Sequence, residues 1–318
     1  MGIQYLNSYV RKNCPDNIRH LSLSELRGKK IAIDTSIYMY RFEGEGGLID
    51  GMYQMIALLR YYEIIPVFIF DGVSPPEKDD LLKLRRLHKD KAELKYIEAN
   101  KRLHKCQGNE IIKITTEMKS LRKQFVKLKT KNIIKVKELM KLCGITYLEA
   151  EGEADQLCVK LVLEKIAFAC MSEDMDMFVY GCPRVLRYFS ILNSSVVLYD
   201  FTAILNTLKL SSDDFKEICV ISGTDYNVNN TQETSLIKTI ELFNKFKHCD
   251  KDSTDSFYEW LINKTNYIKD YNHLKNTLLM FNLSDMSIEK YNTIQIANGI
   301  VNDSELKKFL YEYDFIFV

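Results

Sequence analysis

Short apolar runs alternate with longer amphipathic segments over the first two thirds of the chain. Runs typical of buried strands lie at residues 30–34, 65–72, 145–148, 167–171, 185–188 and 196–199. Helical spacing of apolar residues occupies residues 48–63, 136–143 and 154–164, and beyond Phe201 the pattern becomes helical and stays so. Strands that alternate with helices predict an α/β fold with a doubly wound, mostly parallel central sheet and a helical C-terminal region.

A long basic segment interrupts this alternation after the second predicted strand. Residues 78–137 contain 19 Lys and Arg against 7 Asp and Glu, although the whole chain has a formal net charge of +1. Leu and Ile recur there at the spacing of a narrow apolar stripe, and Gly108-Asn109 is a break signal. We therefore predict a basic helical arch with little core of its own. Such a cluster favours a polyanionic partner, with a solvated helical face as the alternative.

Composition excludes several classes of protein. The chain has 318 residues, of which 46% are hydrophobic, enough for a sizeable core. Its longest clean apolar run, residues 64–70, is far shorter than the roughly 18 residues that a membrane span needs. The eight cysteines never have C-x-x-C spacing, so neither a zinc site nor a disulfide framework is indicated. Without a secretory signal pattern, we expect an intracellular protein with no membrane contact.

Carboxylates follow several of the predicted strands directly. They are Asp34, Asp71, the pair Glu151 and Glu153, the pair Asp174 and Asp176, and, in a later turn, Asp225. Ligands of such sheets gather at the carboxyl ends of the strands, and acids on one rim repel one another unless cations neutralise them. Mg²⁺ or Mn²⁺ are the expected ions. Two such ions about 3.5–4 Å apart form a known clamp for phosphodiester hydrolysis.

Each of these acids also has an ordinary structural interpretation. Asp34 precedes Thr-Ser as a helix N-cap would, and Asp71-Gly72 is typical of a turn. The two later pairs would favour the first turn of a following helix through its dipole. Four separate strand-end clusters in one chain favour a metal site over four unrelated caps and turns.

Six motifs in collinear order resemble the flap endonuclease family. They are MGIQ (1–4), IAIDTSIYMYRF (31–42), PVFIFDG (66–72), EAEGEAD (149–155), SEDMD (172–176) and SGTDY (222–226). The likeness covers about residues 1–226 and, more weakly, NDSELKKFL (302–310). The resemblance implies a structure-specific 5′ nuclease that hydrolyses DNA at 5′ flaps or at branched and ended duplexes, in replication, repair or recombination. We expect a monomer that works in the nucleus or at a cytoplasmic replication site.

The resemblance also assigns roles to particular residues. The family's two-metal site would here consist of Asp34, Asp71, Glu151, Glu153, Asp174, Asp176 and Asp225, holding two Mg²⁺ ions for which Mn²⁺ can substitute. Lys78 and Arg85, at the base of the arch, would contact the scissile phosphate. Tyr40 would stack on the neighbouring base, and Gly2, Lys83 and Arg86 would also contact DNA.

The chain departs from the family pattern in its second half. Residues 227–234 contain no glycine, whereas relatives carry there a glycine-rich hairpin that grips duplex DNA and often holds K⁺. We therefore expect no K⁺ site, and the grip on downstream duplex stays open. The peptide that binds the sliding clamp in relatives is not seen before Val318. Glu149 and Asp155, extra acids beside the metal pair, are expected to face solvent.

The predicted organisation has four parts. Residues 1–77 and 138–226 form the nuclease core, residues 78–137 the arch, and residues 227–318 a helical region that contacts duplex. Two other functions stay open: an RNA-directed endonuclease on the same fold, and a DNA-junction binding protein without catalysis. The complete acidic set and the long arch favour DNA flaps over the first, and intact Asp174 and Asp176 argue against the second.

Overall fold

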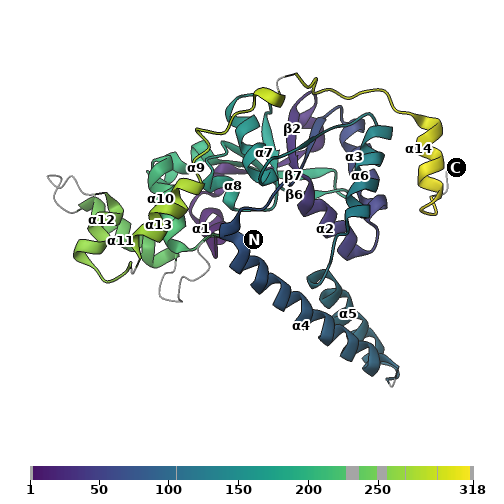
Figure 1. The fold of residues 1–318 in the computed structure, drawn as a ribbon, viewed down its shortest axis with the longest axis horizontal. Helices are drawn as coiled ribbons and strands as arrows, with labels where there is room; N and C mark the ends of the chain where they lie inside the picture. Colours follow the sequence, from purple (N-terminus) through teal and green to yellow (C-terminus); the bar gives the residue numbers. More distant parts are fainter. Residues whose placement is uncertain are drawn as a thin grey trace.

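A seven-stranded sheet lies at the centre of the structure, a computed structural model that describes residues 3–104, 106–226, 236–248, 256–268, 270–291 and 293–315 (Figure 1). The strand order is β1-β7-β6-β5-β2-β3-β4. The strands are β1 (Ile18–Ser22), β2 (Lys30–Asp34), β3 (Ile65–Phe70), β4 (Thr146–Glu149), β5 (Ala169–Met171), β6 (Arg184–Ser190) and β7 (Ser195–Asp200). Strands β2 to β6 pair in parallel, and β7 runs antiparallel to β6 and β1. The predicted mostly parallel α/β sheet is confirmed; β1 was not predicted.

Successive side chains of the central strands enter cores on opposite faces of the sheet. In β2, Ala32 joins one core, while Ile31 and Ile33 join the other. The first core includes side chains of α1 (Leu6–Asn13), α7 (Ala154–Leu163), α8 (Asp176–Val179), α9 (Phe201–Leu208) and α10 (Ser212–Ser222). The second includes those of α2 (Thr35–Glu45), α3 (Leu48–Tyr61), α6 (Thr130–Leu142) and α14 (Asp303–Tyr311). Helices on both faces make the sheet doubly wound.

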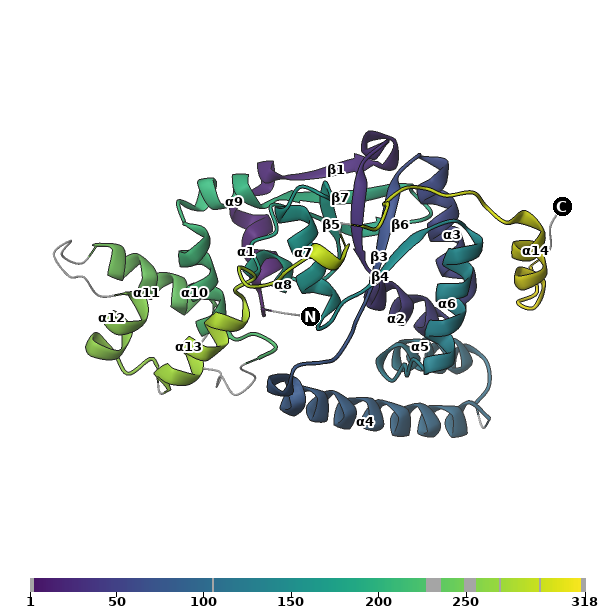
Figure 2. The same ribbon diagram turned by 45° about the horizontal axis from the view of Figure 1, so that its top comes forward.

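The basic segment forms the predicted helical arch. Helices α4 (Asp79–Leu103) and α5 (Asn109–Gln124) project from the body as a hairpin (Figure 1), and in the view of Figure 2 α4 runs beneath the body. Acidic residues in the first turn of α4 and basic residues in its last turn complement the helix dipole. The two helices share only a small apolar cluster around Ala92, Ala99, Ile114 and Leu121. The predicted boundary at residue 137 falls inside α6, whose apolar side packs into the second core.

Among its described residues, the C-terminal region is helical as expected in α11 (Leu236–His248), α12 (Phe257–Lys264), α13 (Tyr271–Met280) and α14, whereas residues 281–302 are mostly irregular apart from the short 3-10 turn Glu289–Tyr291. Helices α11 to α13 gather with α10 at one end of the molecule, left in Figure 1. The chain then crosses the sheet to α14 at the other end. The glycine-less segment 227–234 and Gly2 lie outside the described residues. Within the described parts, no helix is both long and apolar enough to cross a membrane, and all seven cysteines are free thiols.

Substitution of two glycines tests how closely the chain segment that leads to α14 packs against the sheet. Gly144 has φ +62°, and a Cβ there would lie 2.6 Å from the Ile300 carbonyl oxygen. Gly28 has φ +70° with no heavy atom within 4 Å of such a Cβ. We expect Gly28→Ala to lower the free energy of unfolding by about 1–2 kcal/mol, the penalty of left-handed backbone. Gly144→Ala should lose about 1–3 kcal/mol more through overpacking. Urea unfolding measures both, and equal losses would contradict the close approach.

Candidate active site

Four neighbouring parallel strands, in the order β5-β2-β3-β4, bring the predicted acids to one edge of the sheet. Asp34 is the last residue of β2, and Asp71 directly follows β3. The Glu151–Glu153 turn follows β4, and the Asp174–Asp176 turn follows β5. Asp225 reaches the same edge from the turn after α10. The topology thus unites side chains that the sequence places far apart.

A pocket of about 490 Å³ opens between this edge and the base of α4. Its acidic side consists of Asp34, Asp71, Glu153, Asp155, Asp174 and Asp225. Its other side is basic and aromatic, consisting mainly of Tyr40, Lys78, Arg85, Arg86 and Lys89. The acidic sheet edge and the basic arch therefore face each other across one cavity.

The two remaining predicted acids differ in placement. Asp176 lies behind the pocket, 2% exposed, with an Oδ1 atom that has no hydrogen-bond partner. Glu151 points away from the pocket: its side chain is 81% exposed and pairs with Lys290 at 2.5 Å. The structure thus gathers six of the seven predicted acids, and Glu151 is not among them.

The capping interpretation holds in part. Asp34 and Glu153 occupy the N-cap positions of α2 and α7 without a side-chain cap hydrogen bond. Asp71 accepts a hydrogen bond from the Ala154 backbone N–H at 2.9 Å, and Asp174 accepts one from the Asp176 N–H at 3.0 Å. Since all four acids also line the pocket or its edge, these local roles add to the acidic site and do not replace it.

Burial and mutual repulsion raise the carboxyl pKa values. Burial, followed by the charges of Asp71 and Asp174, raises the pKa of Asp34 to about 8. Burial also raises the pKa of Asp176, with added repulsion from Asp174 and Asp225. Hard divalent cations bind carboxylate oxygens. Such ions would relieve the repulsion among these acids and give the buried oxygen a partner. The residues present therefore fit a metal site.

Several of these carboxylates pair with basic side chains in this structure. Lys78 Nζ donates to Glu153 Oε1 at 2.6 Å, and Arg85 Nη2 donates to Asp225 Oδ2 at 2.6 Å. Burial by itself lowers the pKa of Lys78, but the carboxylates of Asp155 and Glu153 outweigh it, and the net shift is upward. Over the described residues, no group of three or more His, Cys, Asp or Glu side chains is arranged as it stands to hold a metal ion. Ion binding thus requires these carboxylates to exchange their partners.

A tyrosine supports the Lys78–Glu153 pair. The Tyr226 hydroxyl donates to Glu153 Oε2 at 2.5 Å, and the Lys78 ammonium lies 4.6 Å from the centre of the Tyr226 ring. The Tyr226 hydroxyl also shares a 2.7 Å hydrogen bond with the Tyr180 hydroxyl. Glu153 is therefore held from both oxygens before any ion binds.

The solvent-facing prediction was right for Glu149 and wrong for Asp155. Glu149 is exposed and pairs with Lys137 at 2.8 Å. Asp155 lines the pocket, because it lies in the first turn of α7 directly after Glu153 and that turn faces the strand ends. The available sequence signal was that acids alternate with small residues over 149–155, although only Glu151 and Glu153 were interpreted as metal ligands.

Some of the predicted DNA-contacting side chains lie at the pocket, and one lies outside it. Tyr40 is 42% exposed at the pocket, and Arg86 lines it, whereas Lys83 lies outside and pairs with Asp80 at 3.0 Å. Lys89 was not singled out, yet its ammonium lies 4.9 Å from the Tyr40 ring centre. Burial, with repulsion from neighbouring cations, lowers the pKa of Lys89. Its spacing, one helical turn after Arg85, was the available signal.

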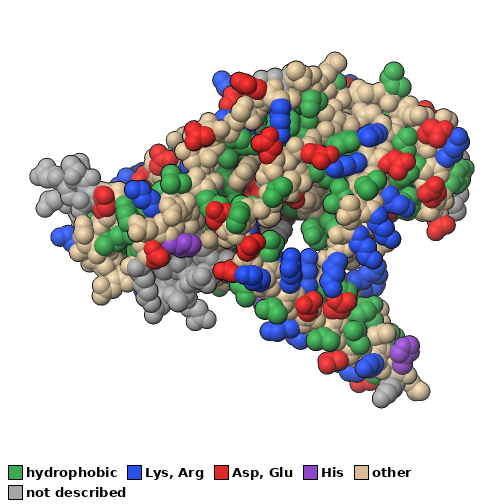
Figure 3. Space-filling model, in the orientation of Figure 1, with side chains coloured by type: hydrophobic (Ala, Val, Ile, Leu, Met, Phe, Trp, Pro, Cys, Tyr) green, Lys and Arg blue, Asp and Glu red, His purple; other side chains and the backbone are tan. Residues whose placement is uncertain are grey.

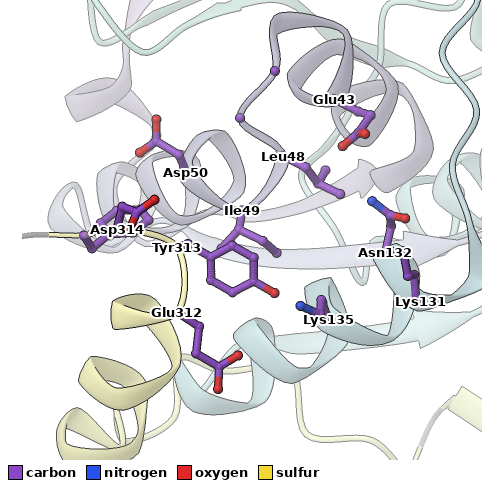
Figure 4. A pocket seen from close by; sticks show the side chains of 13 residues that line it. Glu43, Leu48, Ile49, Asp50, Lys131, Asn132, Lys135, Glu312, Tyr313 and Asp314 are labelled. Atoms are coloured by element: carbon purple, nitrogen blue, oxygen red, sulfur yellow. The ribbon is translucent and has the colours of Figure 1, made fainter.

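A second cavity, about 840 Å³, lies away from the strand ends (Figure 4). It is bordered by the segment after α2, the start of α6 and the residues after α14. Its charged side chains are mixed, consisting of Glu43, Asp50, Glu312 and Asp314 with Lys131 and Lys135. Because none of the predicted metal-binding acids is among the residues that line this cavity, we assign the active site to the strand-end pocket.

An acidic edge on a parallel sheet, facing a basic arch, defines the protein as a metal-dependent nuclease, and comparisons with known proteins agree. The family model described as XPG N-terminal domain matches residues 1–92, and that described as XPG I-region matches residues 144–225. Flap endonuclease 1 of Methanocaldococcus jannaschii is 30% identical over 259 residues, covering 76% of this chain and 74% of that protein. Flap endonuclease 1 of Methanococcus aeolicus is 28% identical over 284 residues, covering 79% and 82%.

The fold has a matching solved relative as well. The catalytic core of Rad2 in complex with DNA substrate superimposes with a TM-score of 0.67 at 20% identity, covering 98% of this chain and 95% of that one. This likeness supports the fold, while the family models and sequence relatives carry the identification. The chain belongs to the flap endonuclease family.

The raised pKa of Asp34 predicts a pH dependence of stability without metal. The folded protein retains this proton up to about pH 8, whereas the unfolded chain loses it near 3.8. The resulting stabilisation is complete below pH 4 and is lost as the pH rises toward 8, at up to about 1.4 kcal/mol per pH unit. In a chelator, the melting temperature of the wild type should therefore fall from pH 5 to pH 8 relative to Asp34→Asn.

The exposed Asp16→Asn variant is the matched control, and its melting curve should follow the wild type across this pH range. Parallel curves for wild type and Asp34→Asn would show that Asp34 is not a buried, repelled carboxyl.

Proposed function

We propose that this chain cuts DNA at 5′ flaps, or at other branched and ended duplexes, in a reaction supported by two Mg²⁺ ions. The observation that carries the proposal is the single pocket where the strand-end acids meet Lys78, Arg85 and Tyr40 at the base of the arch. Family membership supplies the nuclease class, and the Rad2 core matched above was solved with DNA substrate.

The ions would be held by Asp34, Asp71, Glu153, Asp174, Asp176 and Asp225, with Glu151 joining after a side-chain rotation. When bound, two such ions activate water for attack on phosphorus and stabilise the charge of the leaving oxygen; Mn²⁺ can substitute for Mg²⁺. The remaining steps depend on the chain's own side chains.

Lys78 and Arg85 would bind the scissile phosphate. Both now pair with acids of the pocket, and Arg85, at 37% side-chain exposure, has access to solvent. When those carboxylates turn to the ions, the ammonium of Lys78 and the guanidinium of Arg85 are freed within the same cavity. Lys as a point charge and Arg as a planar fork can then both stabilise negative charge that develops on the phosphate.

The arch fits a single strand next to this pocket. Figure 3 shows an opening between the arch and the body, with Lys and Arg side chains gathered along the arch side of it. The second helix of the arch, α5, returns to α2, where Lys123 pairs with Glu45 at 3.4 Å. A positively charged passage beside an exposed aromatic, here Tyr40, is the general design of a single-strand binding channel.

Cleavage of an end-labelled 5′-flap DNA in Mg²⁺ tests the proposal. Asp174→Ala should slow cleavage by at least about a thousandfold, because metal stabilisation of the transition state contributes several kcal/mol. Lys78→Met and Arg85→Met should each slow it by about 10²–10³, as expected for loss of one preorganised charge at the phosphate. Lys83→Met, on the same helix as Arg85 but outside the pocket, should change the rate by less than about threefold.

The outcomes separate the competing functions. A cut near the branch point that vanishes in Asp174→Ala supports the proposal. A wild-type protein that binds the flap and cuts neither DNA nor RNA would be a junction-binding protein. Cleavage of RNA alone would make it an RNA-directed endonuclease on this fold.

A further inference from the structure

The backbone of Glu151 is held in place, so its carboxylate moves by side-chain rotation. Its backbone is fastened to the end of β3: the Val73 N–H donates to the Glu151 carbonyl at 2.9 Å, and the Gly72 N–H donates to the Gly152 carbonyl at 2.7 Å. The approach is so close that a Cβ on Gly72 would lie 2.4 Å from the Glu151 carbonyl oxygen. The direction of the Glu151 carboxylate is therefore decided by its side-chain partner.

That partner is Lys290, from a distant part of the chain. Lys290 Nζ donates to Glu151 Oε1 at 2.5 Å, on the solvent side of the turn and away from the acidic pocket. Its ammonium also lies 4.8 Å from the ring centre of Tyr291. Tyr291 is buried, and its hydroxyl donates to the Glu149 carbonyl at 2.8 Å. The position of Lys290 is thus set by an anchored neighbour.

Lys290 belongs to a strap, defined here as residues 281–291 and 293–302, that joins the C-terminal helices to the edge of β4. The Gly299 N–H donates to the Gly144 carbonyl at 2.7 Å, and the Asn298 side chain donates to the Ile64 carbonyl at 2.9 Å. At the start of the strap, Phe281 contacts the rings of Tyr180 and Tyr226, which support Glu153. The strap therefore borders the active site at both Glu151 and Glu153.

We propose that Lys290 is a positioning residue that holds the Glu151 carboxylate outside the pocket and so sets how readily the metal site is completed. This inference rests on the proposed two-metal function. Rotation of Glu151 away from Lys290 adds the last acid to the ligand set without moving the backbone. An exposed ion pair is weak, so Lys290 tunes ion binding and does not block it.

Mn²⁺ binding, measured without DNA from the electron paramagnetic resonance signal of the free ion, tests this inference. The proteins are wild type, Lys290→Met, Lys290→Arg, Glu151→Gln and the double variant Lys290→Met/Glu151→Gln. Lys290→Met should tighten the weaker Mn²⁺ site by about two- to fivefold, the range expected for an exposed pair. Lys290→Arg should bind as the wild type does, since the ion pair with Glu151 is retained.

The double variant distinguishes a positioning role of Lys290 from a general effect of its charge. If Lys290 acts through Glu151, its removal should have no effect in the Glu151→Gln background. Lys308→Met, which breaks an equally exposed pair with Glu305 on α14, is the matched control and should leave Mn²⁺ binding unchanged. In flap cleavage, Lys290→Met should lower the Mg²⁺ concentration for half-maximal rate and leave kcat at saturating Mg²⁺ unchanged.

The possible results are distinct. Equal Mn²⁺ affinity in wild type and Lys290→Met overturns the positioning role while the two-metal function stands. The same tightening in the Glu151→Gln background also overturns it, because the lysine would then act only as a nearby charge. A wild type that binds no Mn²⁺ and cuts no flap overturns both proposals.

Discussion

Repulsion among buried carboxylates is the constraint on which the rest of this structure depends. Four parallel strands end side by side, and each delivers acids to the same edge, where burial strengthens their repulsion. The structure meets this constraint with basic partners drawn from outside the sheet, above all Lys78 and Arg85 from the base of the arch. Lys78 and Arg85 neutralise the acids in this structure. The same two side chains are suited to bind a phosphate once metal ions take their place beside the acids.

The arch depends on this charge balance because it has little core of its own. Its hairpin is held together by a small apolar cluster and is joined to the body at its two ends. At one end Arg85 pairs with Asp225, and at the other Lys123 pairs with Glu45.

The C-terminal strap gives the acidic edge a second neighbour. It crosses beside β4, contributes Lys290 to Glu151, and places Phe281 against the tyrosines behind Glu153. The acids that follow β4 are therefore in contact with the region that leads to the C-terminal helices, while Lys78 and Arg85 connect the same pocket to the arch. Contacts from the arch and from the strap thus meet at the proposed active site, although the two segments lie far apart in the sequence.

The sequence by itself determined the order of the strands along the chain, the break of the arch at Gly108 and the strand-end positions of the acids. Apolar alternation and turn residues are local signals, and the motifs were sufficient to indicate the family. Only the tertiary structure decided that Ile18–Ser22 pairs at the sheet edge, that Asp155 faces the pocket, that Lys89 lies over Tyr40 and that Glu151 points outward. These features depend on partners far away in sequence. Backbone spacing brings a carboxylate to an edge, but the direction of its side chain is set by whichever cation, hydroxyl or backbone group the fold places beside it.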